Sequence, residues 1–454
     1  MVSEKKSVPR LSLPMHQWLD AARAADMPIA WRGEQTLSLA QLRADVALLS
    51  ARLVERSEKR WALCFDDSYR FAVALLAALY GGKLPVIFGH QREAILKEQR
   101  ADFDALLTDL PLSPGTAVLA VEEGHGVLPP LPAWPSDPQF ILYTSGSTGA
   151  PQAVVKSVAA MDSESELLAP QWLPALRHCR IAASVSHQHM YGLSFRLFMP
   201  MAFGLPFDAR LTEYHEQLIA KNTRYPLVFI SSPAWLKRLD PALAVSECVQ
   251  VFSAGGPLAL AEAQLTQRAL GVLPLEIYGT TETGALAWRQ QTAPSTRWQL
   301  FAGVTLARKA HAIEADSPLV PAPVALSDIL NLAADGRHFE LLGRRDRIIK
   351  IEEKRLSLAE IEKRLLALPE IADAAILPLQ QGGRTVLGVA IVLSALGMTQ
   401  RQTLGDGRFI RGLRQALRPW LEPAALPRSW RIIRAIPLNA QGKRAYAELQ
   451  ELFL

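Results

Sequence analysis

The sequence predicts an α/β protein with a large N-terminal domain, built on mostly parallel sheets with flanking helices, and a small C-terminal α+β domain. Short apolar segments alternate with helix-like segments in the first third of the chain and again from Ile181 to Glu282, a pattern typical of βαβ units. Near Gly343 the chain changes to a charged, hairpin-like stretch followed by an amphipathic helix. We therefore place the two domains at residues 1–345 and 346–454.

The individual elements follow from local patterns. A helix is expected to begin at Leu39. Apolar strands are expected in both domains. The proline-rich stretch 128–138 excludes regular structure, because proline lacks a backbone N–H group. The strands expected with most support are 61–65, 139–143, 181–186, 226–231, 249–254, 275–279, 373–379 and 385–393.

Composition excludes several classes of protein. With 454 residues, 49% of them hydrophobic, the chain can bury more than one core. A formal charge of +5 is mild for this length and gives no reason to expect nucleic-acid binding. The three cysteines, Cys64, Cys179 and Cys248, are odd in number and far apart, so we interpret them as core thiols of a reducing compartment.

No segment predicts export or membrane insertion. The charged N-terminal stretch is not followed by the apolar region of a signal peptide. The best apolar run, Phe71 to Tyr80, is about half of the ~20 residues that a membrane-spanning helix needs. We expect a cytoplasmic protein with no stable membrane insertion.

A glycine- and hydroxyl-rich loop directly follows the expected strand 139–143. Glycines let the backbone approach a polyanion, and hydroxyl and free N–H groups donate to phosphate oxygens. The spacing does not fit a Walker loop, a dinucleotide-binding fingerprint or a hydrolase elbow. A phosphate-binding loop and a flexible connector are the two interpretations. The residues concerned are Thr144, Ser145, Gly146, Ser147, Thr148 and Gly149.

A second polar segment, beginning at Tyr278, also follows an apolar strand. It places one carboxylate, Glu282, among threonines and glycines. The carboxyl ends of strands are where α/β sheets bind ligands, and a carboxylate beside phosphates can hold Mg²⁺. The alternative is a surface turn. Together the two segments indicate a site for phosphates and Mg²⁺ more specifically than either one alone.

These residues resemble the adenylate-forming superfamily, which includes acyl- and aryl-CoA ligases, peptide-synthetase adenylation domains and firefly-type luciferases. The resemblance extends from Thr36 to the end of the chain. It implies that ATP and Mg²⁺ are bound, with the loop at the phosphates, Tyr278 near adenine and Glu282 at the metal. Further residues that it implies at the nucleotide are Gly255, Gly256, Gly279, Thr281 and Arg355.

The resemblance also implies a ribose-binding aspartate at Asp328, a partner arginine at Arg344 and a hinge at Asp346. Without the family pattern, Asp328 would be interpreted as a helix cap or turn residue. Lys443, in a glycine-lysine turn, corresponds to the lysine that stabilises charge on the acid and the α-phosphate. By itself, a lysine near a C-terminus is usually only solvated.

Two histidines, His187 and His189, have a spacing that also suits metal ligation, but no further ligand lies at a suitable distance in the sequence. In the family, a histidine three residues before a glycine lines the acyl pocket, which matches His189. The implied pocket residues are His189, Tyr191, Gly192, Ser232 and Gly255.

Two positions depart from the family pattern. Gln152 replaces the usual lysine after the phosphate loop, and Glu353 replaces a glycine that faces the pantetheine channel. A carboxylate at that position would crowd or repel the incoming arm. Lys350 matches the lysine of the second half-reaction. The segment from Trp298 to Ala325 is shorter than the family's small barrel, and we assign no site residue there.

The predicted activity is ATP-dependent conversion of an aryl or fatty acyl carboxylic acid to its adenylate, with release of pyrophosphate, followed by transfer to a pantetheine thiol. Several segments look similar to short ligases of bacterial aryl-polyene or fatty-acid-type pathways, which implies an acyl carrier protein as partner. Free CoA is the alternative acceptor, and phosphopantetheine or CoA supplies the thiol. Two other hypotheses are a catalytically silent nucleotide-binding module and a kinase or NTPase. The absence of a Walker lysine disfavours the kinase or NTPase.

Overall fold

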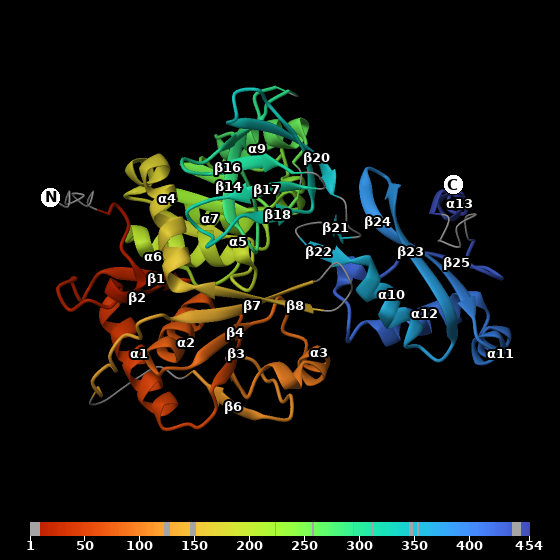
Figure 1. Ribbon diagram of the computed structural model, residues 1–454, viewed down its shortest axis with the longest axis horizontal. Helices are drawn as coiled ribbons and strands as arrows, with labels where there is room; N and C mark the ends of the chain where they lie inside the picture. The colour runs from red at the N-terminus through yellow and green to blue at the C-terminus, as the bar shows by residue number, and fades with distance from the viewer. Residues whose placement is uncertain are drawn as a thin grey trace. The chain divides into compact units, whose positions relative to one another are not determined.

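The computed structural model (Figure 1) describes residues 10–121, 128–145, 151–222, 224–256, 258–293, 295–309, 312–344, 348–351, 354–437 and 446–454. The chain divides into two compact units. The first comprises Met1–Gln91, Gln99–Thr144 and Ala153–Gly343, and the second comprises Arg92–Glu98, Ser145–Gln152 and Arg344–Leu454.

An eleven-stranded sheet forms the larger layer of the first unit. Its centre is parallel, because β10, β9, β11, β12 and β13 pair in parallel with their neighbours. Strands β14, β15 and β20 continue it in antiparallel pairs. In spatial order the strands are β19 (Asp328–Leu332), β20 (His338–Arg344), β15 (Trp298–Leu300), β14 (Gly284–Gln290), β13 (Leu275–Thr280), β12 (Gln250–Ser253), β11 (Leu227–Ser231), β9 (Arg180–Ala183), β10 (Phe207–Asp208), β1 (Pro28–Arg32) and β2 (Gln35–Ser38).

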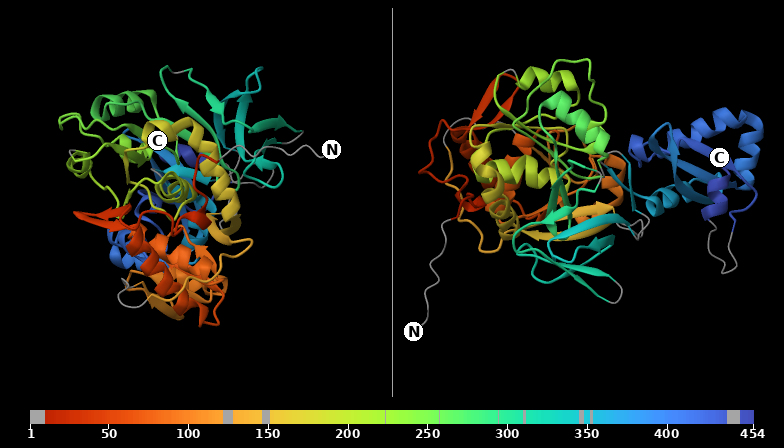
Figure 2. Two further views of the ribbon diagram at one scale, coloured as in Figure 1. Left: turned by 90° about the vertical axis from the view of Figure 1, so that its left-hand side faces the viewer. Right: turned by 90° about the horizontal axis from the view of Figure 1, so that it is seen from above.

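A six-stranded sheet forms the second layer, and the strands of both sheets can be followed from two further sides in Figure 2. Strand β3 pairs in parallel with β4 and β5, and β4 pairs in parallel with β7. The order is β6 (Ala117–Ala120), β5 (Ala105–Thr108), β3 (Arg60–Cys64), β4 (Leu84–Ile87), β7 (Gln139–Ser145) and β8 (Pro151–Ser157).

Residues 298–326 contribute β15 to the large sheet and then form a small antiparallel sheet. Its strands are β16 (Thr305–Arg308), β17 (Ile313–Asp316) and β18 (Val324–Leu326). No site residue was assigned in this region, and its alternation is too short to separate strands from loops by periodicity.

Side-chain caps begin the main helices of the first unit. Ser38 accepts from the Gln41 N–H group at the start of α1 (Leu39–Val54), and Asp67 accepts from Arg70 N–H at the start of α2 (Ser68–Tyr80). Ser157 caps α4 (Val158–Leu176) in the same way. The remaining helices are η1 (Met15–Gln17), α3 (Glu93–Glu98), η2 (Arg100–Asp102), α5 (Met190–Gly192), the π-helix η3 (Leu193–Phe198), α6 (Met199–Phe203), α7 (His215–Asn222), α8 (Pro233–Leu236) and α9 (Leu260–Leu270).

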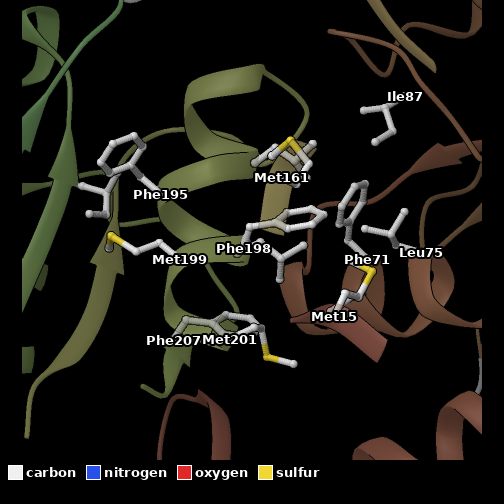
Figure 3. Close-up of a cluster of buried hydrophobic side chains, with 14 of the residues drawn as sticks. Met15, Phe71, Leu75, Ile87, Met161, Phe195, Phe198, Met199, Met201 and Phe207 are labelled. Atoms are coloured by element: carbon white, nitrogen blue, oxygen red, sulfur yellow. The ribbon is translucent and has the colours of Figure 1, made fainter. Parts of the chain in front are cut away.

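One hydrophobic core joins the two sheets of the first unit. Figure 3 draws part of it, with Phe71 and Leu75 of α2 in one cluster with Met161 of α4 and Phe198 of η3. The apolar run that begins at Phe71 is thus a buried helix of a globular core. Across the described ranges, no helix combines the length and apolarity needed to span a bilayer. Cys64, Cys179 and Cys248 are buried free thiols, as predicted.

The second unit contains a three-stranded sheet, covered on both faces by apolar clusters. Its strands are β23 (Ile371–Gln381), β24 (Arg384–Leu393) and β25 (Ser429–Ile432). The charged stretch forms the expected hairpin of β21 (Ile348–Ile351) and β22 (Lys354–Ser357), followed by the amphipathic helix α10 (Leu358–Leu366). The other helices are α11 (Ala395–Leu404), α12 (Asp406–Leu417), η4 (Pro423–Ala425) and α13 (Tyr446–Glu451). The predicted fold class, a large α/β part with a small α+β part, is confirmed.

Candidate active site

Tyr278 and Asp328, two of the residues singled out in the sequence, meet in the first unit. The hydroxyl of Tyr278 donates a 2.9 Å hydrogen bond to Oδ2 of Asp328, and both side chains are buried. The ring of Tyr278 lies 5.8 Å from that of Trp298 and 5.3 Å from that of Phe339, centroid to centroid. These aromatic contacts hold the phenol at the carboxyl end of β13, where it faces the first residue of β19.

Glu282 lies in a tight turn between β13 and β14. Oγ1 of Thr283 accepts from the Thr280 N–H group at 3.1 Å, and the two hydroxyls lie 3.1 Å apart. A side chain at Gly279 would bring its Cβ within 2.2 Å of the carbonyl oxygen of Gly284, so only glycine fits. The turn is therefore fixed by its own residues, with the Glu282 side chain half-buried.

Two buried charged residues that were not predicted from the sequence form hydrogen bonds with this turn and with the start of β14. Nζ of Lys156, on β8, donates to the carbonyl oxygen of Glu282 at 2.8 Å. The carboxylate of Glu164, on α4, accepts from Ala285 N–H at 2.7 Å and from the Ser194 hydroxyl at 2.5 Å. Burial lowers the pKa of Lys156 and raises that of Glu164, while the charge of each favours the ionised form of the other.

A signal for Glu164 was present in the sequence. It lies three residues after Met161 and four before Leu168, both buried, so it falls on the apolar face of α4. A carboxylate at such a position requires a partner. Lys156 gave a weaker signal, since period-2 alternation on a short strand does not distinguish a buried cation from an exposed one.

Serine hydroxyls line the carboxyl ends of the neighbouring parallel strands. Oγ of Ser184, directly after β9, lies 3.0 Å from Oγ of Ser231 at the end of β11. Ser253 ends β12, and its buried hydroxyl has no hydrogen-bond partner within the part of the chain that the structure describes. Gly255 follows with a φ of +91°, and Ser232 begins α8 in a buried position. Polar groups therefore gather along one edge of the sheet.

His189 lies beside the ends of two strands of the other sheet. A Cβ at Gly89, just after β4, would lie 2.9 Å from Cε1 of His189 and 3.8 Å from the carbonyl oxygen of Tyr143 on β7. Gly192 is similarly constrained, because its Cβ would come within 1.9 Å of the Ser186 carbonyl oxygen. Gly89 thus lies between the exposed imidazole of His189 and the backbone of β7.

His187 and His189 have different surroundings. His187 is buried, its Nδ1 lies 2.7 Å from the hydroxyl of Ser68, and its ring is 4.3 Å from that of Phe71. Burial, and then the charge of Arg196, lowers the pKa of His187 well below the ordinary value. In the described segments, no group of three His, Cys, Asp or Glu side chains is arranged to hold a metal ion. His187 is thus a neutral core residue.

Arg196, on η3, fixes the loop that carries both histidines. Its fully buried guanidinium donates to the carbonyl oxygens of Val185 at 3.1 Å and Ala209 at 3.2 Å. Burial lowers the pKa of Arg196 to about 10, whereas Asp208 and Asp67 raise it. The group remains charged at neutral pH, so it ties the loop to the sheet through charge-assisted hydrogen bonds.

Tyr191, a predicted pocket residue, packs its ring 5.1 Å from that of Phe195, and burial raises the pKa of its hydroxyl well above the ordinary value. Tyr143, at the strand that leads into the phosphate loop, stacks on Phe88 at 4.8 Å. Burial and Asp102 raise the pKa of Tyr143 to about 12. Both phenols are therefore neutral across the physiological range.

Several predicted residues fall outside the described residues. They are Gly146, Ser147, Thr148, Gly149, Asp346, Glu353 and Lys443; the backbones of Ser145 and Arg344 are described but their side chains are not. Thr144 and Ser145 end β7. In the second unit, Lys350 and Arg355 are directly opposite each other in the β21–β22 hairpin. All of these assignments stay predictions.

Fold and site together define an enzyme that activates carboxylic acids with ATP. Residues 86–313 match the family described as AMP-binding enzyme, and the chain belongs to that family. The resemblance to adenylate-forming enzymes is thereby confirmed. The protein is an AMP-forming acid–thiol ligase, which couples ATP-dependent adenylation of an acid to ligation with a thiol.

Similar proteins cover most of the chain. Anthranilate–CoA ligase of Pseudomonas aeruginosa is 27% identical, over 93% of this chain and 92% of its own length. The L-proline–[L-prolyl-carrier protein] ligase of Pseudomonas fluorescens is 27% identical, over 58% of this chain and 60% of its own length. The structure of o-succinylbenzoate CoA synthetase from Bacillus subtilis, bound to a product analogue, has a TM-score of 0.80 at 18% identity and covers 97% of this chain and 99% of that one, which shows the common fold.

Proposed function

We propose that this enzyme adenylates an aryl or fatty acyl carboxylic acid and transfers the acyl group to the pantetheine thiol of an acyl carrier protein. The hydrogen bond between Tyr278 and Asp328 carries the proposal. It places an aromatic ring and a carboxylate side by side at the carboxyl edge of a parallel sheet, a donor and acceptor set suited to a nucleoside.

The remaining groups at this edge fit the rest of the nucleotide. Asp328 retains acceptor capacity for ribose hydroxyls, since Tyr278 uses only one lone-pair site of the carboxylate. The Ser253 hydroxyl, which has no partner among the described residues, and the backbone of Gly255 and Gly256 offer further polar groups. Thr144 and the loop after it are assigned to the phosphates. Glu282, with Thr281 beside it, is assigned to Mg²⁺, which would neutralise charge on the departing pyrophosphate.

The acid is assigned to the region around His189. Gly89 leaves the imidazole room, and Tyr191, Gly192, Ser232 and Gly255 are the other proposed pocket residues. An exposed imidazole on a loop that also carries Tyr191 suits a substrate with a carboxylate and a flat or apolar body. We therefore expect aryl and fatty acyl acids to be better substrates than small polar acids.

The acceptor is a carrier-bound or a free pantetheine thiol. One relative uses a carrier protein and the other uses CoA, so both remain candidates by similarity. Glu353 does not discriminate between them, because CoA and a carrier protein both deliver a pantetheine arm. The sequence segments that are similar to ligases of aryl-polyene pathways favour the carrier in our proposal.

The direct test is acid-dependent pyrophosphate exchange over a panel of aryl and fatty acyl acids, with hydroxamate trapping of the adenylate. We expect exchange with at least one member, followed by transfer to a holo-carrier protein that mass spectrometry detects. Transfer to free CoA alone would replace the acceptor proposal. A silent nucleotide-binding module, which Gln152 and Glu353 would favour, gives no exchange with any acid.

Two lysine variants separate the half-reactions. Lys443→Ala should cripple pyrophosphate exchange but spare thioester formation from a supplied acyl-adenylate. Lys350→Ala should have the opposite effect, because Lys350 is assigned to the second step. Equal loss of both steps in both variants would show that the two roles are wrongly assigned.

A further inference from the structure

Positive charge in this chain is concentrated in one segment of the second unit. From Arg384 to Arg434 the sequence contains nine arginines, no lysine and only two carboxylates, Asp406 and Glu422. This surplus of seven positive charges exceeds the formal charge of the entire chain, +5. The rest of the protein is therefore slightly acidic, and an asymmetry of this kind indicates a surface for an anionic partner.

Four of these arginines lie on α12 and its C-cap, and we call them the arginine face: Arg408, Arg411, Arg414 and Arg418. Phe409, Leu413 and Leu417 bury the opposite stripe of the helix in the core of the unit. At about 100° per residue, the four arginines occupy an arc of roughly 120° and extend over about 15 Å of helix. Arg408, Arg411 and Arg418 are exposed.

Within the described part of the chain, no carboxylate neutralises the arginine face. Asp406 pairs with Arg401, at 2.7 Å, and Glu422 pairs with Lys354, so both carboxylates of the segment are already used. Nε of Arg411 donates only to the backbone carbonyl of Gly407. Among the residues that the structure describes, no carboxylate lies within ion-pair distance of the four arginines. Mutual repulsion of such cations is relieved only by an external anion.

Apolar side chains accompany the arginines on the neighbouring helix. Leu396, Met398 and Leu404 of α11 are exposed by 47%, 52% and 45%, and α11 packs against α12. Arginine and methionine are enriched in protein–protein interfaces, whereas lysine is depleted. The absence of lysine from the segment thus favours a protein partner over simple solubility.

We propose that the arginine face of α12 docks the acidic surface of the carrier protein whose pantetheine thiol accepts the acyl group; this inference rests on the proposed function. The four guanidiniums extend over about 15 Å and match a row of carboxylates on a partner helix. This span is longer than the diphosphate of one CoA molecule. The apolar stripe of α12 is buried, so the helix lacks the free apolar face that lies in a membrane surface.

The test is charge reversal at Arg408, Arg411 and Arg418 together, to Glu, in the full-length enzyme. The matched control reverses Arg384, Arg428 and Arg434, which are exposed in the same segment but lie outside α12. With a bacterial fatty-acid-type holo-acyl carrier protein as probe, we expect kcat/KM for acyl transfer to fall at least about 10-fold in the α12 variant and to lose most of its dependence on salt. Pyrophosphate exchange and transfer to free CoA should remain at the wild-type level.

Direct binding separates this inference from the proposed function. Anisotropy of the labelled holo-carrier protein at low salt measures docking even if no acid supports pyrophosphate exchange. If only the α12 variant binds the carrier protein more weakly than the wild type, the result supports the arginine face as the docking surface. Equal binding by the wild type and both variants overturns it, as does an equal loss in the control. If transfer to free CoA alone falls in the α12 variant, the arginine face binds CoA phosphates instead. If the enzyme binds anionic phosphatidylglycerol vesicles but not the carrier protein, the face is a membrane-binding surface.

Discussion

The phenol of Tyr278 donates a hydrogen bond of 2.9 Å to the carboxylate of Asp328, although 50 residues separate them in the sequence. The pair joins β13 to β19, which lie on opposite sides of three other strands in the large sheet. Binding of a ribose to Asp328 would therefore depend on a hydroxyl held by a different part of the sheet.

Tyr278→Phe tests this dependence. The ring would keep its contacts with Trp298 and Phe339, but the carboxylate would lose its donor. A hydrogen bond to a charged group contributes about 1.5–3 kcal/mol, so we expect KM for ATP to rise by about 10-fold or more with kcat little changed. Steady-state pyrophosphate exchange measures both. Tyr214→Phe, at an exposed tyrosine, is the control, and an unchanged KM for ATP would contradict the assignment of Asp328.

Lys156→Met tests the support beneath the Glu282 turn. The variant removes the donor to the Glu282 carbonyl and leaves Glu164 without its neighbouring positive charge. Losing a buried hydrogen bond from a charged donor costs about 1.5–3 kcal/mol of unfolding free energy. We also expect the Mg²⁺ concentration for half-maximal adenylation to rise, because the turn would no longer hold the carboxylate in place.

Chemical denaturation and a Mg²⁺ titration distinguish the two effects of Lys156. Lys237→Met removes an exposed lysine and should change neither measurement. If the folded Lys156→Met enzyme had a wild-type Mg²⁺ dependence, the lysine would support only stability.

Gly89→Ala tests the packing around His189. The new Cβ would lie 2.9 Å from Cε1 of the imidazole, closer than side chains pack, so the ring must move. We expect KM for the acid to rise several-fold while KM for ATP stays constant. Gly407→Ala, in open space on α12, is the control. Equal changes in both KM values would place His189 outside the acid pocket.

Asp162→Asn tests a pH-dependent contribution to stability. Burial raises the pKa of Asp162 to about 6, although the Met15 N–H group, which donates to it at 2.9 Å, opposes the shift. A carboxyl whose folded pKa is raised stabilises the fold at low pH, and this contribution is lost as pH rises through about 6. The shift from 3.8 to about 6 corresponds to about 3 kcal/mol at most.

The asparagine variant keeps an acceptor for Met15 and cannot ionise. Its free energy of unfolding should exceed that of the wild type at pH 7.5 by up to about 3 kcal/mol, with the difference vanishing near pH 4. Urea unfolding at several pH values measures this. A difference that does not vary with pH would mean that the pKa of Asp162 is the same in the native and the unfolded protein.

Strand positions were predictable where apolar runs were continuous. The expected strands 226–231, 249–254 and 275–279 correspond to β11, β12 and β13 within one residue or so at each end. Central parallel strands are buried on both faces, which produces such runs. The short strands β16 to β18 and β14, the antiparallel partner of β13, have no such signal, because their burial depends on neighbours distant in the sequence.

The same distinction applies to the candidate site. Tyr278, Asp328 and His189 could be selected because each lies in a recognisable segment. Lys156 and Glu164 could not be paired from the sequence, since their contacts with the Glu282 turn depend on how β8 and α4 pack against β14. Gly89 gave no signal at all, because the reason for its small size is a histidine at the start of α5, 100 residues later in the sequence.

The close approach of Gly192 to the Ser186 carbonyl limits how this enzyme can be redesigned. If Tyr191 lines the acid pocket as proposed, a mutant library aimed at new acid substrates would gain by randomising it, since its ring packs against Phe195 at 5.1 Å. Randomising Gly192 would yield misfolded clones, since any side chain there would overlap the backbone by more than 1 Å relative to ordinary contact. Substrate range can therefore evolve through neighbours of His189 while the turn that presents it stays invariant.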